Sequence, residues 1–472
     1  MHATAHALLR RPSWLVLAGL PALLAAAPAS SGDARPAVPP QWQAGAAVAG
    51  PLDTAALANW WKRFDDPVLD QLIDNALRQS PDIRTALSRI ASARASKNIE
   101  RSGLFPSLNA SASGSGSRTE VRATDVTTTT ENYGASLDAS WEIDLFGKQR
   151  LALSAAQADL AQATENFHAA QVSLAAEVAT AYVTLRSTEA QLAALETSLS
   201  AQAETAQIAQ WRQQAGIVSV LDARQATSAL EQSRASLPSL RQTLSETRNQ
   251  LATLCGRTPG ELDALLAAPR ALPAVPASLA TGIPAETLRQ RPDIRAAERG
   301  FDAAVARTKS AKRDRLPSLS LTGSLGVESL KAGDIFSPDR NLARLVGSLS
   351  APIFAAGRIQ ATIQIKTEAE RQALIAYESA VLSALAEVEN AQTSVARTAE
   401  RLDSLSRAAE AASEASTLAA QKYQAGQADL LVALDAQRTS LSLEQQRVAA
   451  QAAQLTAHIR LYKSLGGGWS SL

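Results

Sequence analysis

Residues 133–145 read YGASLDASWEIDL, and shortly beyond them the run from Lys148 to Ala215 contains neither Gly nor Pro. In the first segment, apolar side chains alternate strictly with small or acidic ones, which is the pattern of a β-strand with one apolar and one polar face. Asp138, Glu142 and Asp144 fall on the polar face. The chain is therefore expected to pass from a strand directly into a very long helix.

The run from Lys148 to Ala215 predicts a helix of unusual length. Its 68 residues would form a helix on the order of 100 Å long. Leucines and other apolar residues recur in it every seven positions, which favours a coiled-coil seam. A second run without Gly or Pro extends from Arg358 to Ala425. Helices of this length need neighbours along their whole length, so we expect an elongated, oligomeric helical assembly.

The second long run belongs to a second copy of the whole unit. The segment PDIR at 81–84 recurs at 292–295, and QAG at 214–216 recurs at 424–426. Two further matches fall between these in the same order, which indicates an internal duplication rather than a short solenoid repeat. The expected boundaries are a first repeat at 30–258, a Pro-rich extended connector at 259–284 and a second repeat at 285–472.

Each repeat is expected to contain a helix, two short strands and a long helical hairpin. The strands are predicted at about 104–117, 132–146, 316–328 and 341–354, and the hairpins at about 148–255 and 358–463. Four strands are too few to close a β-barrel, which needs about eight, so a barrel would require several chains. A soluble sheet with one wet face is the alternative that the strands alone leave open.

The N-terminal residues have the order of a secretory signal. Arg10 and Arg11 precede an apolar run, Trp14–Ala27, and small residues follow up to Ala29. This arrangement predicts a signal peptide at 1–29, cleaved after Ala29. A membrane anchor is the alternative, although an anchor needs about 20 apolar residues. No later stretch of 18 apolar residues occurs.

The composition argues against several classes of function. The 472 residues include 46 basic and 45 acidic side chains, and a net charge of +1 gives no reason to expect nucleic acid. The single cysteine, Cys255, rules out a disulfide framework and is expected to be a small buried residue. No nucleophile-elbow, zinc-protease or phosphate-loop motif occurs. The sequence therefore predicts no enzyme, no cofactor and no metal site.

Several longer segments resemble the outer-membrane factor family of TolC-like proteins, and most closely its efflux lipoprotein branch. They are spread over nearly the whole chain after the signal, in the order typical of the family. One difference is the absence of the lipidated Cys that this branch usually carries at its mature N-terminus. The matching segments are WWKRFDDPVLDQLIDNAL at 60–77, WEIDLFGKQR at 141–150, RPDIRAAER at 291–299, LPSLSLTGSLG at 316–326, KYQAGQADLLVALDAQRTSL at 422–441 and SLGGGW at 464–469.

This resemblance implies a mainly α fold with a small β part. In the family, a homotrimer forms a twelve-stranded β-barrel in the outer membrane of a Gram-negative bacterium and continues into the periplasm as a twelve-helix α-barrel. The implied function is the exit duct of a tripartite efflux pump for small toxic compounds, with a periplasmic adaptor and an inner-membrane transporter as partners. The alternatives are a type I protein secretion duct and a periplasmic coiled-coil scaffold without a pore.

Three groups of residues are candidates for functional roles. In the family the hairpin turns meet the adaptor, so the resemblance implies adaptor contacts in the segments 214–219 and 424–429. The residues singled out are Gln214, Ala215, Gly216, Gln424, Ala425 and Gly426. The periplasmic aperture candidates are Asp429, Asp435, Arg212 and Lys422, and the barrel-lumen candidates are Asp138, Glu142 and Asp144. Ordinary structural roles are the alternatives: the two glycines would end helices, Asp429 would be a helix N-cap, and the strand acids would form a solvated face.

Overall fold

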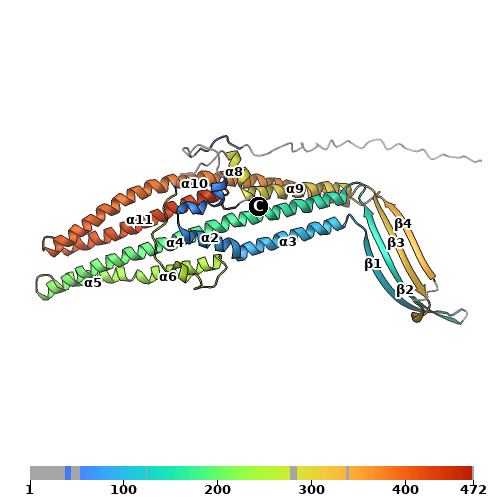
Figure 1. Ribbon diagram of the computed structural model, residues 1–472, viewed down its shortest axis with the longest axis horizontal. Helices are drawn as coiled ribbons and strands as arrows, with labels where there is room; N and C mark the ends of the chain where they lie inside the picture. Colours follow the sequence, from blue (N-terminus) through green and yellow to red (C-terminus); the bar gives the residue numbers. More distant parts are fainter. Residues whose placement is uncertain (1–37, 44–53, 124, 277–283, 336–339, 470–472) are drawn as a thin grey trace, which may run out of the picture. The chain divides into compact units, whose positions relative to one another are not determined.

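The computed structural model describes residues 38–43, 54–123, 125–276, 284–335 and 340–469, which belong to one compact unit spanning 37–472 (Figure 1). The predicted signal peptide and its cleavage site lie outside the described residues. The described chain is mainly helical with one small sheet, as expected. None of its described helices is both long enough and apolar enough to cross a membrane.

Four antiparallel strands form the sheet in the order β1-β2-β3-β4. β1 and β2 are 15 and 18 residues long, and they extend beyond the expected bounds: β1 ends at Val121 rather than near 117, and β2 begins at Val126 rather than near 132. They are longer because pairing continues through polar residues as far as Val121 and Val126, where the alternation of apolar residues has already stopped. The strands are β1 (Ser107–Val121), β2 (Val126–Ile143), β3 (Ser318–Ser329) and β4 (Arg340–Ser350).

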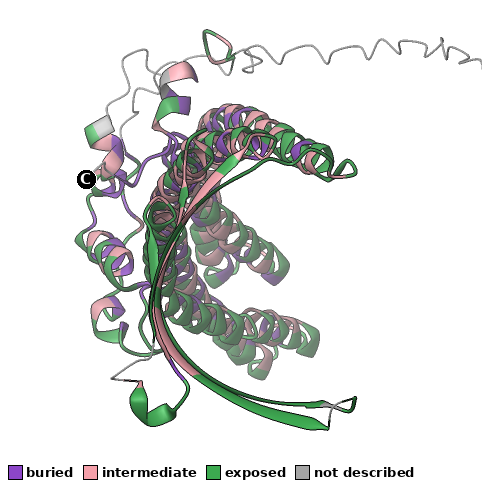
Figure 2. Ribbon diagram, turned by 90° about the vertical axis from the view of Figure 1, so that its right-hand side faces the viewer, coloured by how far each residue is buried: buried purple, intermediate pink, exposed green. Residues whose placement is uncertain are grey.

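The register of the sheet gives it one apolar and one polar face. Leu137 on β2 lies opposite Ala110 on β1 and Leu325 on β3. The next residue, Asp138, lies opposite Asn109 and Ser324, and its side chain points to the other face because neighbouring residues of a strand alternate. Nearly all side chains of the sheet are exposed or half-buried in the single chain (Figure 2).

The two longest helices are α4 (Lys148–Gln214) and α10 (Arg358–Gln424), each of 67 residues, so the two long-helix predictions are confirmed. Gly216 and Gly426 follow them with φ of +71° and +76°, a conformation that costs glycine little. In the first turn, Ile217 N–H donates to Arg212 O at 2.8 Å and Gly216 N–H to Gln213 O at 3.0 Å. This is the hydrogen-bond pattern of a Schellman motif, and it confirms that the glycines end the helices.

The two hairpins return in different ways. In the second repeat α11 (Leu430–Ser464) is continuous, whereas the first repeat returns as α5 (Val220–Arg234) and α6 (Leu237–Leu254). The break follows from Pro238, which lies in the first turn of α6 and has no N–H to continue the hydrogen bonds of α5.

Four helices lie side by side between the sheet and the hairpins, in the order α3, α4, α9, α10 (Figure 1). α3 (Pro81–Ser102) and α9 (Pro292–Arg313) have 22 residues each and begin with the repeated PDIR segment. Both place proline in the first helical turn, where a missing N–H is tolerated. The sheet begins where these helices end, so the strands and the long helices of both repeats share one junction.

The main apolar core lies midway along the long helices. It contains the 3-10 helix η1 (Trp60–Phe64), and the Trp60 ring stacks on Tyr462 with a centroid distance of 5.4 Å. Asp66 caps α2 (Pro67–Gln79) and also accepts a 2.6 Å hydrogen bond from the Tyr182 hydroxyl. Cys255 is fully buried there, as predicted, and burial raises the pKa of its thiol to about 11. The remaining short helices are α1 (Thr54–Ala58), α7 (Asp263–Leu266), α8 (Pro284–Gln290) and η2 (Ala332–Asp334).

The connector between the repeats is not extended throughout. Its residues 263–266 form α7, and Leu262 and Leu266 are buried in the main core. The expected extended linker therefore contains a packed helical turn, because its two leucines supply apolar surface that the neighbouring helices cover.

Candidate functional site

The tips of the two hairpins are tied together by Arg212. Its guanidinium donates a 3.1 Å hydrogen bond to the backbone oxygen of Gln424 and lies 4.8 Å from the ring centroid of Tyr423. The Gln424 side chain in turn donates to Glu204 Oε1 at 3.1 Å. Tyr423 is only 2% exposed, and burial raises the pKa of its hydroxyl. The end of α4 thus holds the end of α10 through a charged group over an aromatic face.

Small side chains allow the hairpins to approach closely behind this contact. Gln437 on α11 is buried and donates a 2.9 Å hydrogen bond to the Thr205 hydroxyl on α4. The hairpins also share a small core of their own near the tips, which consists of Ala206, Ala209, Ala226, Tyr423, Leu430 and Ala433. Because most of these are alanines, close approach rather than a large apolar core fixes the hairpins at the tips.

The other three aperture candidates do not reach the opposite hairpin. Asp429 occupies the N-cap position of α11, but its exposed carboxylate makes no capping hydrogen bond there. Asp435 forms a 2.7 Å ion pair with Arg438 on its own helix. Lys422 is exposed and makes no ion pair with any described residue. Arg212 is therefore the one member of this group that the structure brings into contact with the other hairpin.

The six residues proposed for adaptor contact are exposed at the tips, and the structure adds exposed apolar neighbours, most of which lie outside the two turn segments. Ile217, directly after the first turn, is 71% exposed. The apolar pairs at the start of the returning helices, Val220–Leu221 and Leu431–Val432, were the signal that could have found the rest of this surface. The large exposed apolar residues near the tips are Trp211, Ile217, Val220, Leu221, Leu418, Leu431 and Val432.

On the sheet, Asp138 is the centre of a serine cluster. Its carboxylate accepts hydrogen bonds from the hydroxyls of Ser136 and Ser324, both at 2.7 Å, and of Ser111 at 3.4 Å. These serines come from three neighbouring strands. Glu142 lies on the same polar face, opposite Ser320. Asp138 and Glu142 thus share a continuous polar surface, as the alternation predicts.

The prediction that Asp144 shares this face is wrong. It lies beyond the end of β2, where its carboxylate accepts hydrogen bonds from the backbone N–H groups of Gln149 at 3.2 Å and Arg150 at 3.0 Å. The N-cap of α4 is Gly147, which has no side chain to do this. Burial alone would raise the pKa of Asp144, but hydrogen bonds and the charge of Arg150 outweigh it and lower the pKa.

The sequence and fold both match known proteins. The family described as outer membrane efflux protein matches residues 72–257 and 283–467. The toluene efflux pump outer membrane protein TtgF of Pseudomonas putida is 32% identical over 419 residues, which cover 88% of this chain and 86% of that protein.

Two further matches cover even more of the chain. The pyoverdine export outer membrane protein OpmQ of Pseudomonas aeruginosa is 32% identical over 444 residues, 92% of each protein. The solved structure of the outer-membrane channel OprN has a TM-score of 0.84 and 35% sequence identity, and it covers 93% of this chain and 99% of its own.

Proposed function

The chain belongs to the outer membrane efflux protein family, so it is the outer-membrane component of an efflux pump, and we propose that three copies assemble to form the exit duct. It is located in the outer membrane of a Gram-negative bacterium and extends into the periplasm. The observation that carries the proposed trimer is the four-stranded sheet, whose outer strands β1 and β4 have no further strand beside them in the described chain. Backbone groups at such an edge need partners inside a membrane.

Three copies would complete both parts of the duct. Four strands from each copy make a barrel of twelve, above the minimum of about eight. Its apolar face would meet lipid, and Asp138 and Glu142 would line the lumen, where acidic side chains favour cations. The row of α3, α4, α9 and α10 in each copy supplies four helices, so three copies would make a twelve-helix tube.

The narrow end of the duct is assigned to the hairpin tips. Asp429 is exposed and makes no capping bond, so three symmetry-related copies would place three carboxylates around the axis. Like charges close together repel each other, and protonation or a bound divalent cation relieves the repulsion. Arg212, fixed to Gln424 and Tyr423, would hold the two hairpins of one copy together while such a ring opens or closes.

The partners we propose are a periplasmic adaptor at the tips and an inner-membrane transporter behind it. The exposed apolar residues around Ile217 and Leu431 suit an adaptor, because a solvent-exposed apolar patch usually marks a protein contact. The named cargoes of the relatives are toluene and pyoverdine, so the cargo we propose is a class of small toxic or secreted compounds.

A planar bilayer recording of the purified protein tests the duct. We expect discrete single-channel openings. A protein that inserts or binds without conductance would contradict the exit-duct function and favour the scaffold without a pore.

The same recording tests the aperture. Asp429→Ala should raise the single-channel conductance or abolish its dependence on divalent cations, because the acidic ring is removed. Asp403→Ala is the matched control. The Asp403 carboxylate is also exposed, but it pairs with Arg407 on α10 and lies about six helical turns before the hairpin turn, so the conductance of this variant should stay at the wild-type value. An Asp429→Ala channel indistinguishable from wild type would remove Asp429 from the aperture.

A further inference from the structure

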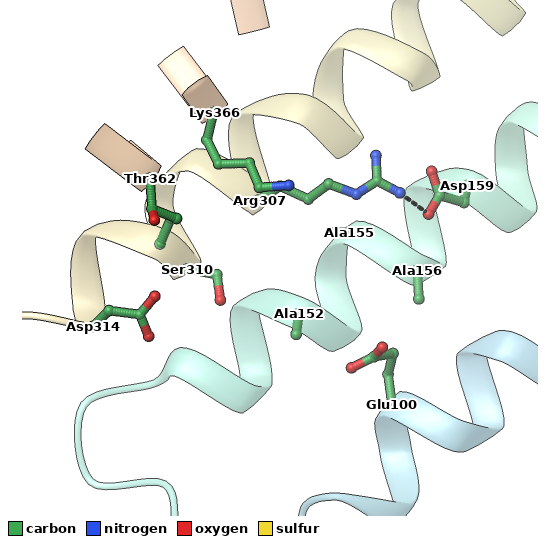
Figure 3. A pocket seen from close by; sticks show the side chains of 11 residues that line it. Glu100, Ala152, Ala155, Ala156, Asp159, Arg307, Ser310, Asp314, Thr362 and Lys366 are labelled. Carbon is green, nitrogen blue, oxygen red and sulfur yellow. Dashed lines mark hydrogen bonds and ion pairs between the residues drawn. The ribbon is translucent and has the colours of Figure 1, made fainter. Parts of the chain in front are cut away.

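The contact between α4 and α9 shows how the two repeats of one chain fit together. A cavity of about 260 Å³ lies along it, and the small residues Ala155, Ala156, Ser310 and Ala311 form part of its lining (Figure 3). Three ion pairs connect the two helices: Asp159 with Arg307, Lys148 with Asp314 at 2.8 Å, and Glu165 with Arg295 at 2.7 Å. Small side chains and charge pairs thus hold the repeats together within a chain.

The duplication gives this contact a counterpart. α9 begins 211 residues after α3, and α10 begins 210 residues after α4, with equal lengths in each pair. The counterpart of α4 against α9 is therefore α10 against α3. Within one chain these two helices stand at opposite ends of the row of four, so the counterpart contact requires a second copy (Figure 1).

The residues at the corresponding positions are exposed in the described part of the single chain. Ala155 corresponds to Ile365 on α10, and Ser310 corresponds to Ile99 on α3. Ile365 is 67% exposed and Ile99 is 69% exposed, although their counterparts Ala155 and Ser310 lie in the contact between α4 and α9. Two apolar side chains therefore face solvent where the intrachain contact has small ones.

The same correspondence places two opposite charges together. Ala156 corresponds to Lys366 and Ala311 to Glu100. Neither Lys366 nor Glu100 has an ion-pair partner within the described part of the chain, and both line the cavity beside α4 and α9 (Figure 3).

The charge pairs of the intrachain contact have no equivalents at these positions. Each pair loses its acidic member, because Ala369 corresponds to Asp159, Ile375 to Glu165 and Gly103 to Asp314. The second contact must therefore be held by different residues from the first.

We propose that α10 of one copy packs on α3 of the next, with Ile365 against Ile99 and the Lys366 ammonium paired with the Glu100 carboxylate. This inference rests on the assembly proposed above and adds the residues that set its register. Burial of the isoleucine pair supplies apolar contact, and the single charge pair fixes which positions face each other, because a shift along the helix would separate the charges.

Cysteine cross-linking tests the isoleucine contact. In outer membranes, the Ile99→Cys and Ile365→Cys double variant should give covalent dimers and trimers on oxidation, seen on a denaturing gel. The single variants should stay monomeric on that gel, because Cys255 is buried and free. The matched control combines Ile99→Cys with Leu382→Cys, an exposed α10 position 60% accessible and about 25 Å further along the helix.

Charge exchange tests the ion pair independently. Glu100→Lys and Lys366→Glu should each lower the temperature at which the assembly dissociates in mild detergent, and the double exchange should restore it. Absence of both the cross-link and the rescue in a wild-type protein that is trimeric and conducting would overturn this contact while leaving the exit duct intact. A wild-type protein that is monomeric would instead overturn the assembly itself.

Discussion

Asp144 shows how one side chain joins the sheet to the longest helix. The first turn of every α-helix has N–H groups without helical partners, and Gly147 cannot supply an acceptor at the start of α4. The Asp144 carboxylate accepts two of these N–H groups and forms a 3.1 Å ion pair with Arg150. A residue that the strand pattern assigns to the lumen is therefore a helix cap.

Asp144→Ala should destabilise the protein by about 1 kcal/mol at pH 7, the typical cost of losing a helix cap. The folded-state pKa of Asp144 is lowered, so its stabilisation is present above the unfolded pKa and is lost as the pH falls through the folded one. The difference between the unfolding temperatures of wild type and variant should thus become smaller below about pH 4. Glu142→Ala, which removes an exposed acid of the same segment, is the control; an equal effect of both variants would refute the cap.

At the scale of elements, the C-terminal tail connects parts of the chain that are far apart in sequence. The Trp469 ring lies 4.5 Å from the His168 ring on α4 and 5.1 Å from the Arg295 guanidinium on α9. A side chain at Gly467 would come within 2.9 Å of the Leu57 backbone oxygen. The three glycines before Trp469 therefore let the tail pass closely over the main core.

Gly467→Ala should destabilise the protein by about 1–3 kcal/mol, since an added methyl group in a packed contact forces neighbouring atoms apart. Thermal unfolding in detergent measures this. Gly333→Ala is the matched control, because a methyl group there meets nothing within 4 Å. If the two variants unfold at the same temperature, the tail is not tightly packed on the core.

The elements that the sequence predicts well are those decided by local patterns. The ends of α4 and α10 follow from the absence of Gly and Pro up to Gly216 and Gly426. The faces of β2 follow from its alternation. Contacts between distant segments have no such signal: the hydrogen bond of Arg212 to Gln424 and the ring contact of Trp469 with His168 depend on how the repeats pack. The role of Asp144 was mistaken because the alternation of apolar and polar residues continues to Leu145, two residues past Ile143, where the pairing of β2 with β3 ends.

At the scale of the whole molecule, the duplication accounts for the edges at which we propose that three copies join. Two repeats supply a sheet of four strands and a row of four helices. In the described chain, the strand or helix at each end of these has a neighbour from the sheet or the row on one side only. β1 and β4 are open in the sheet as α3 and α10 are in the helical row. In the proposed trimer, the same repeat that joins the halves of a chain would also supply the edges that join whole chains.

The native mass of the mature protein, extracted from outer membranes in mild detergent, tests this account most directly. Three copies are expected, because three sheets of four strands can close a barrel and three helical rows can close a tube. A monomer would contradict the account, since its four strands cannot close a barrel. A dimer would contradict it too, because two copies supply only eight strands and eight helices, whereas the proposed duct has twelve of each.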